Sequence, residues 1–135
     1  MLKYMLDTNM IIYTIKKRPV RVKNLFKQHS EQICISSVTL GELIYGAEKS
    51  TQTERNLNDI EGLTARMEVL DFDVPAALHF GQIRAELARN GKSIGPYDAM
   101  IAGHARSRGL VLVTNNTREF NRVQGLRLEN WTTSK

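Results

Sequence analysis

The sequence MLKYMLDTNMIIY, at residues 1–13, contains the stretch that decides the fold. Residues 1–6 form a short apolar and aromatic run, which is typical of a buried β-strand. Thr8 or Asn9 is a suitable N-cap for a helix over the apolar residues that follow. Asp7 is therefore expected at the carboxyl end of a central strand, where open α/β sheets bind their ligands. An acidic residue there would also serve as a simple helix cap, and this stretch alone leaves both roles open.

Strands and helices are predicted to alternate along the rest of the chain. Further strands are expected over Gln32–Ser36, Val69–Phe72, Leu110–Val113 and Leu126–Leu128, and helices over Glu54–Met67 and from Pro19, Ser37, Asp73 and Pro96. Thr39 and Glu42 have the spacing of a capping box at the start of one of these helices. The alternation predicts one domain over residues 1–135, with a three-layer α/β/α architecture and a central, mostly parallel sheet.

The composition is that of a globular protein in a reducing compartment. Cys34 is the only cysteine, so no internal disulfide can form, and we interpret it as a small buried hydrophobe. No apolar segment approaches the roughly 18 residues that a membrane span needs. Asp7 interrupts the first apolar run too early for a signal peptide. We therefore expect a cytoplasmic protein without a membrane partner.

Positive charge is concentrated in one part of the chain. Nineteen Lys and Arg residues outnumber 14 Asp and Glu residues, which gives a net charge of +5. Six basic residues with no acidic residue among them lie close together: Lys16, Lys17, Arg18, Arg21, Lys23 and Lys27. Such a run is either a solvated helix face or a surface that attracts a phosphate backbone. The first five are our candidates for contacts to a nucleic acid.

Four polar side chains are expected at one edge of the sheet. Asp7 ends a strand, and Asn116 follows the last core strand. Glu42 and Asp98 lie in the first turns of helices. Because these points share one edge of a parallel sheet, the side chains would converge on one pocket. Carboxylates about 4 Å apart repel by about 4 kcal/mol at an effective dielectric constant near 20, so they need protons or a cation. Oxygen ligands alone suit Mg²⁺ or Mn²⁺ rather than Zn²⁺.

Four motifs along the chain resemble those of the PIN-domain ribonucleases. They are Asp7-Thr8-Asn9, Thr39-Leu40-Gly41-Glu42-Leu43, Gly95-Pro96-Tyr97-Asp98 and Val113-Thr114-Asn115-Asn116-Thr117-Arg118-Glu119-Phe120. The resemblance runs over nearly the full length and is closest to the VapC toxins of bacterial toxin–antitoxin pairs. It implies a PIN-like fold and a Mg²⁺-dependent endoribonuclease in which Mn²⁺ can substitute. It also implies a homodimer that forms a hetero-oligomer with a VapB-type antitoxin, and an RNA substrate, for which we expect transfer RNA and in particular initiator tRNA. We expect the antitoxin in grooves between the N-terminal helices and the helix over Glu54–Met67.

The resemblance further implies roles for single residues. Three positions match the metal-binding acids of the family: Asp7, Glu42 and Asp98. The fourth acidic position falls on Asn116, whose amide supplies an oxygen without a charge. Glu119, three residues further on, is either the missing carboxylate or a solvated loop acid. Asn9 and Thr114 match polar positions that are expected to orient ligands rather than bind the metal ion.

Other classes of protein share parts of this pattern. A phosphoacceptor receiver domain has a similar length and an acidic pocket, but Asn115 and Asn116 stand where it needs a lysine. A haloacid-dehalogenase-type phosphatase ends its first strand in Asp-x-Asp, where this chain has Asn9. An RNA-binding domain with weak catalysis or none agrees with the basic run and disagrees with the intact acids. The histidines show no ligand spacing and are predicted to be structural or surface residues: His29, His79 and His104.

Overall fold

A five-stranded sheet forms the centre of the molecule, in a computed structural model that describes residues 1–133. The strands are β1 (Tyr4–Leu6), β2 (Ile33–Ser36), β3 (Glu68–Leu70), β4 (Val111–Val113) and β5 (Leu128–Glu129). Their order across the sheet is β3-β2-β1-β4-β5, and each neighbouring pair is parallel. The first strand of the chain therefore lies in the middle. The predicted α/β fold is confirmed, and the sheet expected to be mostly parallel is parallel throughout the described residues.

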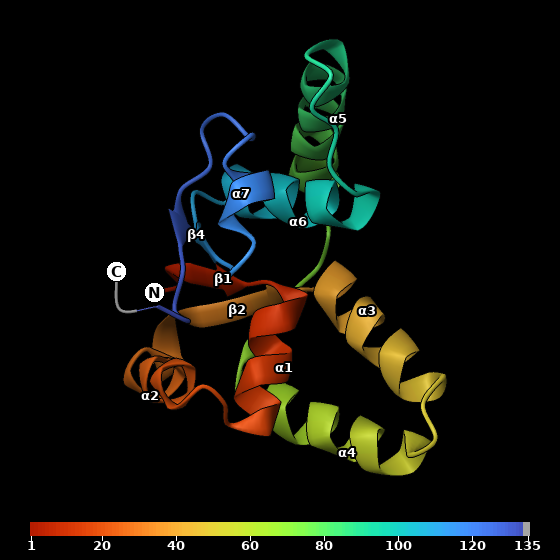
Figure 1. Cartoon of the computed structure of the whole chain (residues 1–135), viewed down its shortest axis with the longest axis vertical. Helices are drawn as coiled ribbons and strands as arrows, with labels where there is room; N and C mark the ends of the chain where they lie inside the picture. Colours follow the sequence, from red (N-terminus) through yellow and green to blue (C-terminus); the bar gives the residue numbers. More distant parts are fainter. Residues whose placement is uncertain (134–135) are drawn as a thin grey trace.

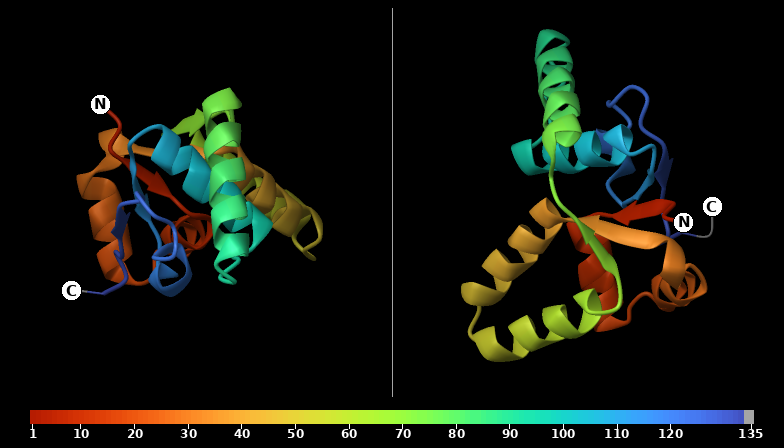
Figure 2. Two further views of the ribbon diagram at one scale, coloured as in Figure 1. Left: turned by 90° about the horizontal axis from the view of Figure 1, so that it is seen from above. Right: turned by 180° about the vertical axis from the view of Figure 1, so that it is seen from behind.

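Helices cover both faces of this sheet (Figures 1 and 2). They are α1 (Thr8–Lys16), α2 (Val20–Gln28), α3 (Ser37–Glu48), α4 (Thr53–Thr64), α5 (Val74–Arg89), α6 (Pro96–Ser107) and the short α7 (Thr117–Phe120), with a 3₁₀ turn, η1 (Ser30–Gln32). Alternate side chains of β1 divide between the two faces. Tyr4 and Leu6 pack with α1 to α4, whereas Met5 packs with α5 and α6. This division confirms the predicted three layers.

The helix α1 begins earlier than the sequence indicated. Asp7 is its N-cap, because the Asp7 carboxylate accepts a hydrogen bond of 3.0 Å from the backbone N–H of Met10. The prediction that Thr8 or Asn9 caps this helix is therefore wrong, and both residues lie inside it. A carboxylate caps a helix as well as a hydroxyl does. Asp7 thus ends a strand and starts a helix within one residue.

The predicted capping box in α3 is also wrong. Ser36, the last residue of β2, is the N-cap of this helix, and its hydroxyl accepts a hydrogen bond of 3.0 Å from the N–H of Val38. Thr39 lies within the helix, and its buried hydroxyl has no hydrogen-bond partner among residues 1–133. Because a residue outside the helix already caps it, Glu42 is free for another contact.

Other boundaries differ from the predictions by a few residues. The helix predicted over 54–67 is α4, which ends at Thr64, and the strand predicted over 69–72 is β3, which ends at Leu70. The edge strand predicted over 126–128 is β5, at Leu128–Glu129. Frayed ends of helices and strands make shifts of this size common.

The structure also bears on the expected burial of Cys34 and on the absence of a membrane-spanning segment. Cys34 is a free thiol, fully buried in the core cluster beneath α5 and α6, as predicted. Among residues 1–133, no helix combines the length and the apolar character that crossing a bilayer requires.

The helices α5 and α6 meet backbone to backbone at Gly103. A Cβ atom on Gly103 would lie 2.7 Å from the backbone nitrogen of Phe80 and 2.9 Å from its Cα atom, closer than van der Waals contact allows. Only a residue without a Cβ atom fits this approach. Because Asp98 stands in the first turn of α6, the contact also fixes where Asp98 lies.

Candidate active site

Asp7 lies at the carboxyl end of the central strand and is only 5% exposed. One of its carboxylate oxygens accepts the capping bond from the N–H of Met10, and the other accepts a hydrogen bond of 2.5 Å from the hydroxyl of Thr114. The Thr114 hydroxyl in turn accepts a bond of 2.9 Å from the N–H of Asn116. Burial raises the pKa of Asp7, the two donated hydrogen bonds lower it, and the charge of Glu42 raises it, with a net rise. The buried Thr114 thus orients a carboxylate, the kind of role expected from the resemblance.

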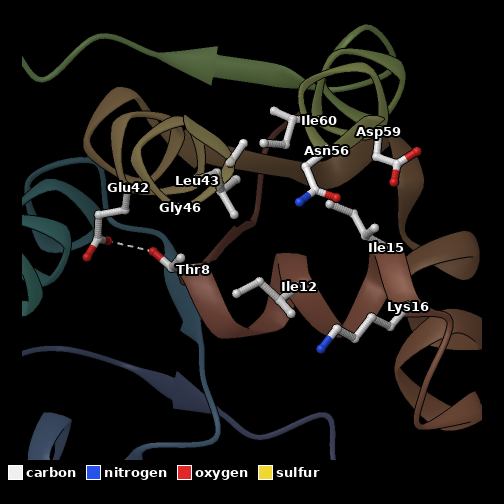
Figure 3. Close-up of a pocket in the computed structure, with 11 residues that line it drawn as sticks. Thr8, Ile12, Ile15, Lys16, Glu42, Leu43, Gly46, Asn56, Asp59 and Ile60 are labelled. Carbon is white, nitrogen blue, oxygen red and sulfur yellow. Dashed lines mark hydrogen bonds between the residues drawn. The ribbon is translucent and has the colours of Figure 1, made fainter. Parts of the chain in front are cut away.

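Glu42 is held by a residue for which the sequence had indicated another role. The hydroxyl of Thr8 donates a hydrogen bond of 2.6 Å to its carboxylate, and Figure 3 shows the two side chains pointing toward each other. Thr8 is the first residue of α1, so this bond joins the start of α1 to α3. The prediction that Glu42 lies in the first turn of its helix is wrong, because α3 begins at Ser37 and has no acidic residue in its first turn. Asn9, the neighbour expected to orient ligands, is exposed, and that role stays a prediction.

Asp98 carries the clearest electrostatic sign of a shared site. Burial raises the pKa of Asp98 to about 6, with further contributions from the charges of Glu42, Asp7 and Glu119. These four carboxylates come from different segments of the chain: the end of β1, α3, α6 and α7. The charges of Glu42, Asp7 and Glu119 therefore act on Asp98, and a metal site shared by these acids stays a prediction.

Glu119 joins this group, whereas Asn116 takes part indirectly. Asn116 is the N-cap residue of α7, and its side-chain amide donates a hydrogen bond of 3.2 Å to the Glu119 carboxylate. The negative charge of Glu119 acts on Asp98. The two roles that the sequence left open for Glu119, the missing carboxylate and a solvated loop acid, both stay predictions.

The donor set fits a divalent ion, although the side chains are turned toward other partners. As they stand, no three His, Cys, Asp or Glu side chains in the described part of the chain are grouped closely enough to hold a metal ion. Thr8 holds Glu42, and Thr114 and a backbone N–H hold Asp7. Carboxylates whose charges raise the pKa of Asp98 nevertheless form the kind of oxygen donor set that suits Mg²⁺ or Mn²⁺.

The basic run lies away from the acids and is fully accessible. Its residues are exposed at the end of α1 and the beginning of α2: Lys16, Lys17, Arg18, Arg21 and Lys23. Asp7 stands at the other end of α1. Since a helix rises about 1.5 Å per residue, the run begins about 14 Å from the acidic cluster.

A groove runs along α1 from Glu42, one of these acids, to Lys16. It encloses about 310 Å³ between α1, α3 and α4 (Figure 3), and its lining includes Thr8 and Glu42 at one end and Lys16 at the other. Apolar side chains line the middle: Ile12, Ile15, Leu43 and Ile60. The groove therefore offers an apolar surface that leads to the acids.

Comparison with known proteins identifies the family to which this fold belongs. The profile of the PIN domain matches residues 4–126. A tRNA(fMet)-specific endonuclease VapC from Shigella flexneri is 65% identical over 131 residues, which cover 97% of this chain and 99% of that protein. Ribonuclease VapC2 from Haemophilus influenzae is 55% identical over the same shares.

A solved structure gives the same result in three dimensions. One chain in the crystal structure of DNA-bound VapBC from Salmonella typhimurium superposes on this protein with a TM-score of 0.93 and is 62% identical to it in sequence. The match covers 97% of this chain and 99% of that chain. The chain therefore belongs to the PIN domain family, among the VapC ribonucleases.

Proposed function

We propose that this protein is a Mg²⁺-dependent endoribonuclease, the toxin of a toxin–antitoxin pair, in which Mn²⁺ can substitute for Mg²⁺. The observation that carries the proposal is that Asp98, whose pKa burial raises to about 6, also feels the charges of three carboxylates from other segments of the chain: Glu42, Asp7 and Glu119. Nucleases of the PIN family generally use divalent metal ions. Asp7, Glu42 and Asp98 would hold the ion, with Glu119 as the fourth carboxylate.

The residues of the cluster would divide the work of phosphodiester hydrolysis. A bound divalent ion supplies Lewis-acid chemistry, since it lowers the pKa of a water ligand and neutralises charge on phosphate oxygens. Asp98, with its pKa near 6, is suited to accept the proton of the attacking water at neutral pH. Thr114 and Thr8 orient the carboxylates of Asp7 and Glu42. The water oxygen bonds to phosphorus, the bond to the 3′ oxygen breaks, and the products carry 5′-phosphate and 3′-hydroxyl ends.

The proposed substrate is transfer RNA, specifically initiator tRNA. The support is the relative from Shigella flexneri, 65% identical, whose name states specificity for tRNA(fMet). The exposed basic residues at the end of α1 would bind the phosphate backbone about 14 Å from the acids. Acting on transfer RNA, the protein would work in the cytoplasm, as the sequence led us to expect.

Cleavage assays with and without a chelator test the proposal. Purified protein is expected to cut initiator tRNA in Mg²⁺ and to lose this activity in EDTA, and sequencing of the fragment ends would give the cleavage position. Asp7→Asn is the matched inactive variant, because asparagine caps a helix as well as aspartate does, and the change removes the charge and one of the two acceptor oxygens. This variant should fold normally and should no longer inhibit growth. Cleavage that persists in EDTA, or in Asp7→Asn, would contradict the proposal.

The proposed partner is a VapB-type antitoxin, bound in the groove between α1, α3 and α4. The support is the apolar lining of this groove, its contact with Glu42, and the solved structures of VapBC complexes. Ile15→Arg, inside the groove, is expected to weaken antitoxin binding at least tenfold. Val20→Arg is the matched control, since Val20 is 63% exposed on α2 and does not line the groove. Equal binding by both variants would refute this location. The homodimer stays a prediction, which sedimentation of the free protein would test.

A further inference from the structure

His104 is a buried imidazole that takes no part in the acidic cluster. It lies on α6 with no solvent exposure, and the ring of Phe72 packs at right angles to it with 5.5 Å between ring centroids. Its Nδ1 atom lies 2.8 Å from the hydroxyl oxygen of Ser36. Its Nε2 atom is buried and has no hydrogen-bond partner in the described part of the chain. The imidazole therefore makes a single polar contact.

The surroundings keep this imidazole neutral. Burial is the main cause that lowers the pKa of His104. Asp73 and Asp71, on the connection from β3 to α5, raise the pKa, and Arg108, just after α6, lowers it. A charged ring would also carry an N–H at Nε2, where no acceptor lies. Either neutral tautomer bonds to Ser36, because a hydroxyl both donates and accepts.

The bond from His104 connects two helices that each carry an acid of the cluster. Ser36 is the N-cap residue of α3, and Glu42 stands six residues further along the chain. Asp98 stands on α6, six residues before His104. On its other side α6 is fixed to α5 by the backbone contact at Gly103. The hydrogen bond therefore relates the start of α3 to a helix that cannot shift freely.

We propose that His104 is a positioning residue: its hydrogen bond to Ser36 sets the distance between α3 and α6, and thereby between Glu42 and Asp98. This inference rests on the proposed function, because the distance matters when the two carboxylates share an ion. A second hydrogen bond holds α3 without His104, since the hydroxyl of Ser37 accepts a hydrogen bond of 3.1 Å from the backbone N–H of Phe72. Loss of the His104 bond should therefore displace Glu42 without unfolding α3.

Two substitutions separate the hydrogen bond from the space that the ring fills. His104→Asn places an amide near the position of Nδ1 and keeps a partner for Ser36. His104→Leu fills a comparable volume with no polar atom. The full-length protein would be titrated with Mn²⁺ by calorimetry, and kcat and KM would be measured separately on initiator tRNA.

His104→Leu is expected to weaken Mn²⁺ binding by roughly 10-fold and to lower kcat by about 10- to 100-fold, with KM changed less than about twofold. His104→Asn should recover most of both losses. If Ser36 and His104 act through one bond, His104→Leu should add nothing further to a Ser36→Ala variant.

Several results would overturn the inference. One is a His104→Leu protein that melts earlier but binds Mn²⁺ and turns over like the wild type, because the ring would then serve packing alone. Equal losses in the Asn and Leu variants would exclude the hydrogen bond. Wild-type protein that binds Mn²⁺ but cuts no RNA would refute the proposed function, and the titrations would still decide the positioning role. Wild-type protein that binds no Mn²⁺ would overturn both.

Discussion

Replacing Asp98 by asparagine is expected to make the metal-free protein more stable. The Asp98 carboxyl has a pKa of about 6 in the folded protein, against 3.8 for an unperturbed aspartate. Because the folded pKa is the higher one, the folded state binds more protons between these values, and its stability falls as the pH rises through them. Ionised Asp98 therefore opposes folding at neutral pH. An amide of the same shape removes this cost.

The size of the effect follows from the shift and two corrections. A difference of roughly 2 pKa units corresponds to about 3 kcal/mol. Asp98 is only partly buried, so solvent screening reduces this to about 1–2 kcal/mol. The variant also loses a carboxylate from the first turn of α6, where the helix dipole favours it by about 0.3–1 kcal/mol. The net gain is about 1 kcal/mol in the free energy of unfolding, or roughly 3–5 °C in Tm for a chain of this size.

Thermal unfolding in EDTA at several pH values would measure this gain. It should be full at pH 8 and shrink toward zero as the pH falls from about 6 to below 4, because the wild-type carboxyl is then protonated in both the folded and the unfolded state and carries no charge. Asp59→Asn, an exposed acid on α4, is the control and should change stability by less than about 0.5 kcal/mol. Saturating Mn²⁺ should stabilise the wild type more than the Asp98 variant. A variant less stable than the wild type at pH 8 without metal would refute the reasoning.

Three further outcomes follow from single contacts. Thr8→Val removes the donor to Glu42 and should lower kcat about 10-fold; Thr14→Val, whose hydroxyl bonds only to its own helix, should not, and equal kinetics in the two would count against the Glu42 contact. Gly103→Ala should lower the free energy of unfolding by about 2 kcal/mol or more in urea melts, because its methyl group meets the backbone of α5. Gly62→Ala, in open space on α4, should instead stabilise by about 0.5–1 kcal/mol. Arg21→Glu should raise KM for RNA several-fold and flatten its salt dependence while kcat stays constant; an unchanged KM would remove the basic run from the RNA surface.

The sequence predicted the layers correctly because one rule governs them throughout. Uniformly apolar strands that alternate with amphipathic helices must be covered on both faces. The starts of α1 and α3 were the exceptions. Asp7 and Ser36 each end a strand and cap the next helix, so the link between strand and helix has no residues of its own. N-cap preferences led us to choose a hydroxyl or amide side chain after the strand as the cap. That choice was wrong here, because the caps are Asp7 and Ser36 themselves.

The candidate acids of the site could be named from the sequence, but the side chains that hydrogen-bond to them could not. Asp7 and Asp98 were candidates because strand ends and first helical turns share an edge in a parallel sheet. The same reasoning placed Glu42 in a first turn, whereas it is the sixth residue of α3. The bond from Thr8 to Glu42 spans 34 residues, and no local pattern indicates it. His104 looked structural, and its complete burial agrees with this, but its bond to Ser36 crosses 68 residues and is visible only in three dimensions. Glu119 needed the position of α7 before its charge could be related to Asp98.

The central place of β1 has a consequence for synthesis on the ribosome. The hydrogen bond between Thr114 and Asp7 joins positions 107 residues apart. The strand β1 can pair with β4 only after residues 111–113 have left the exit tunnel. A nascent chain therefore cannot complete the acidic pocket before residues 111–114 have emerged. The enzyme we propose would be harmless to the machinery that makes it until that point.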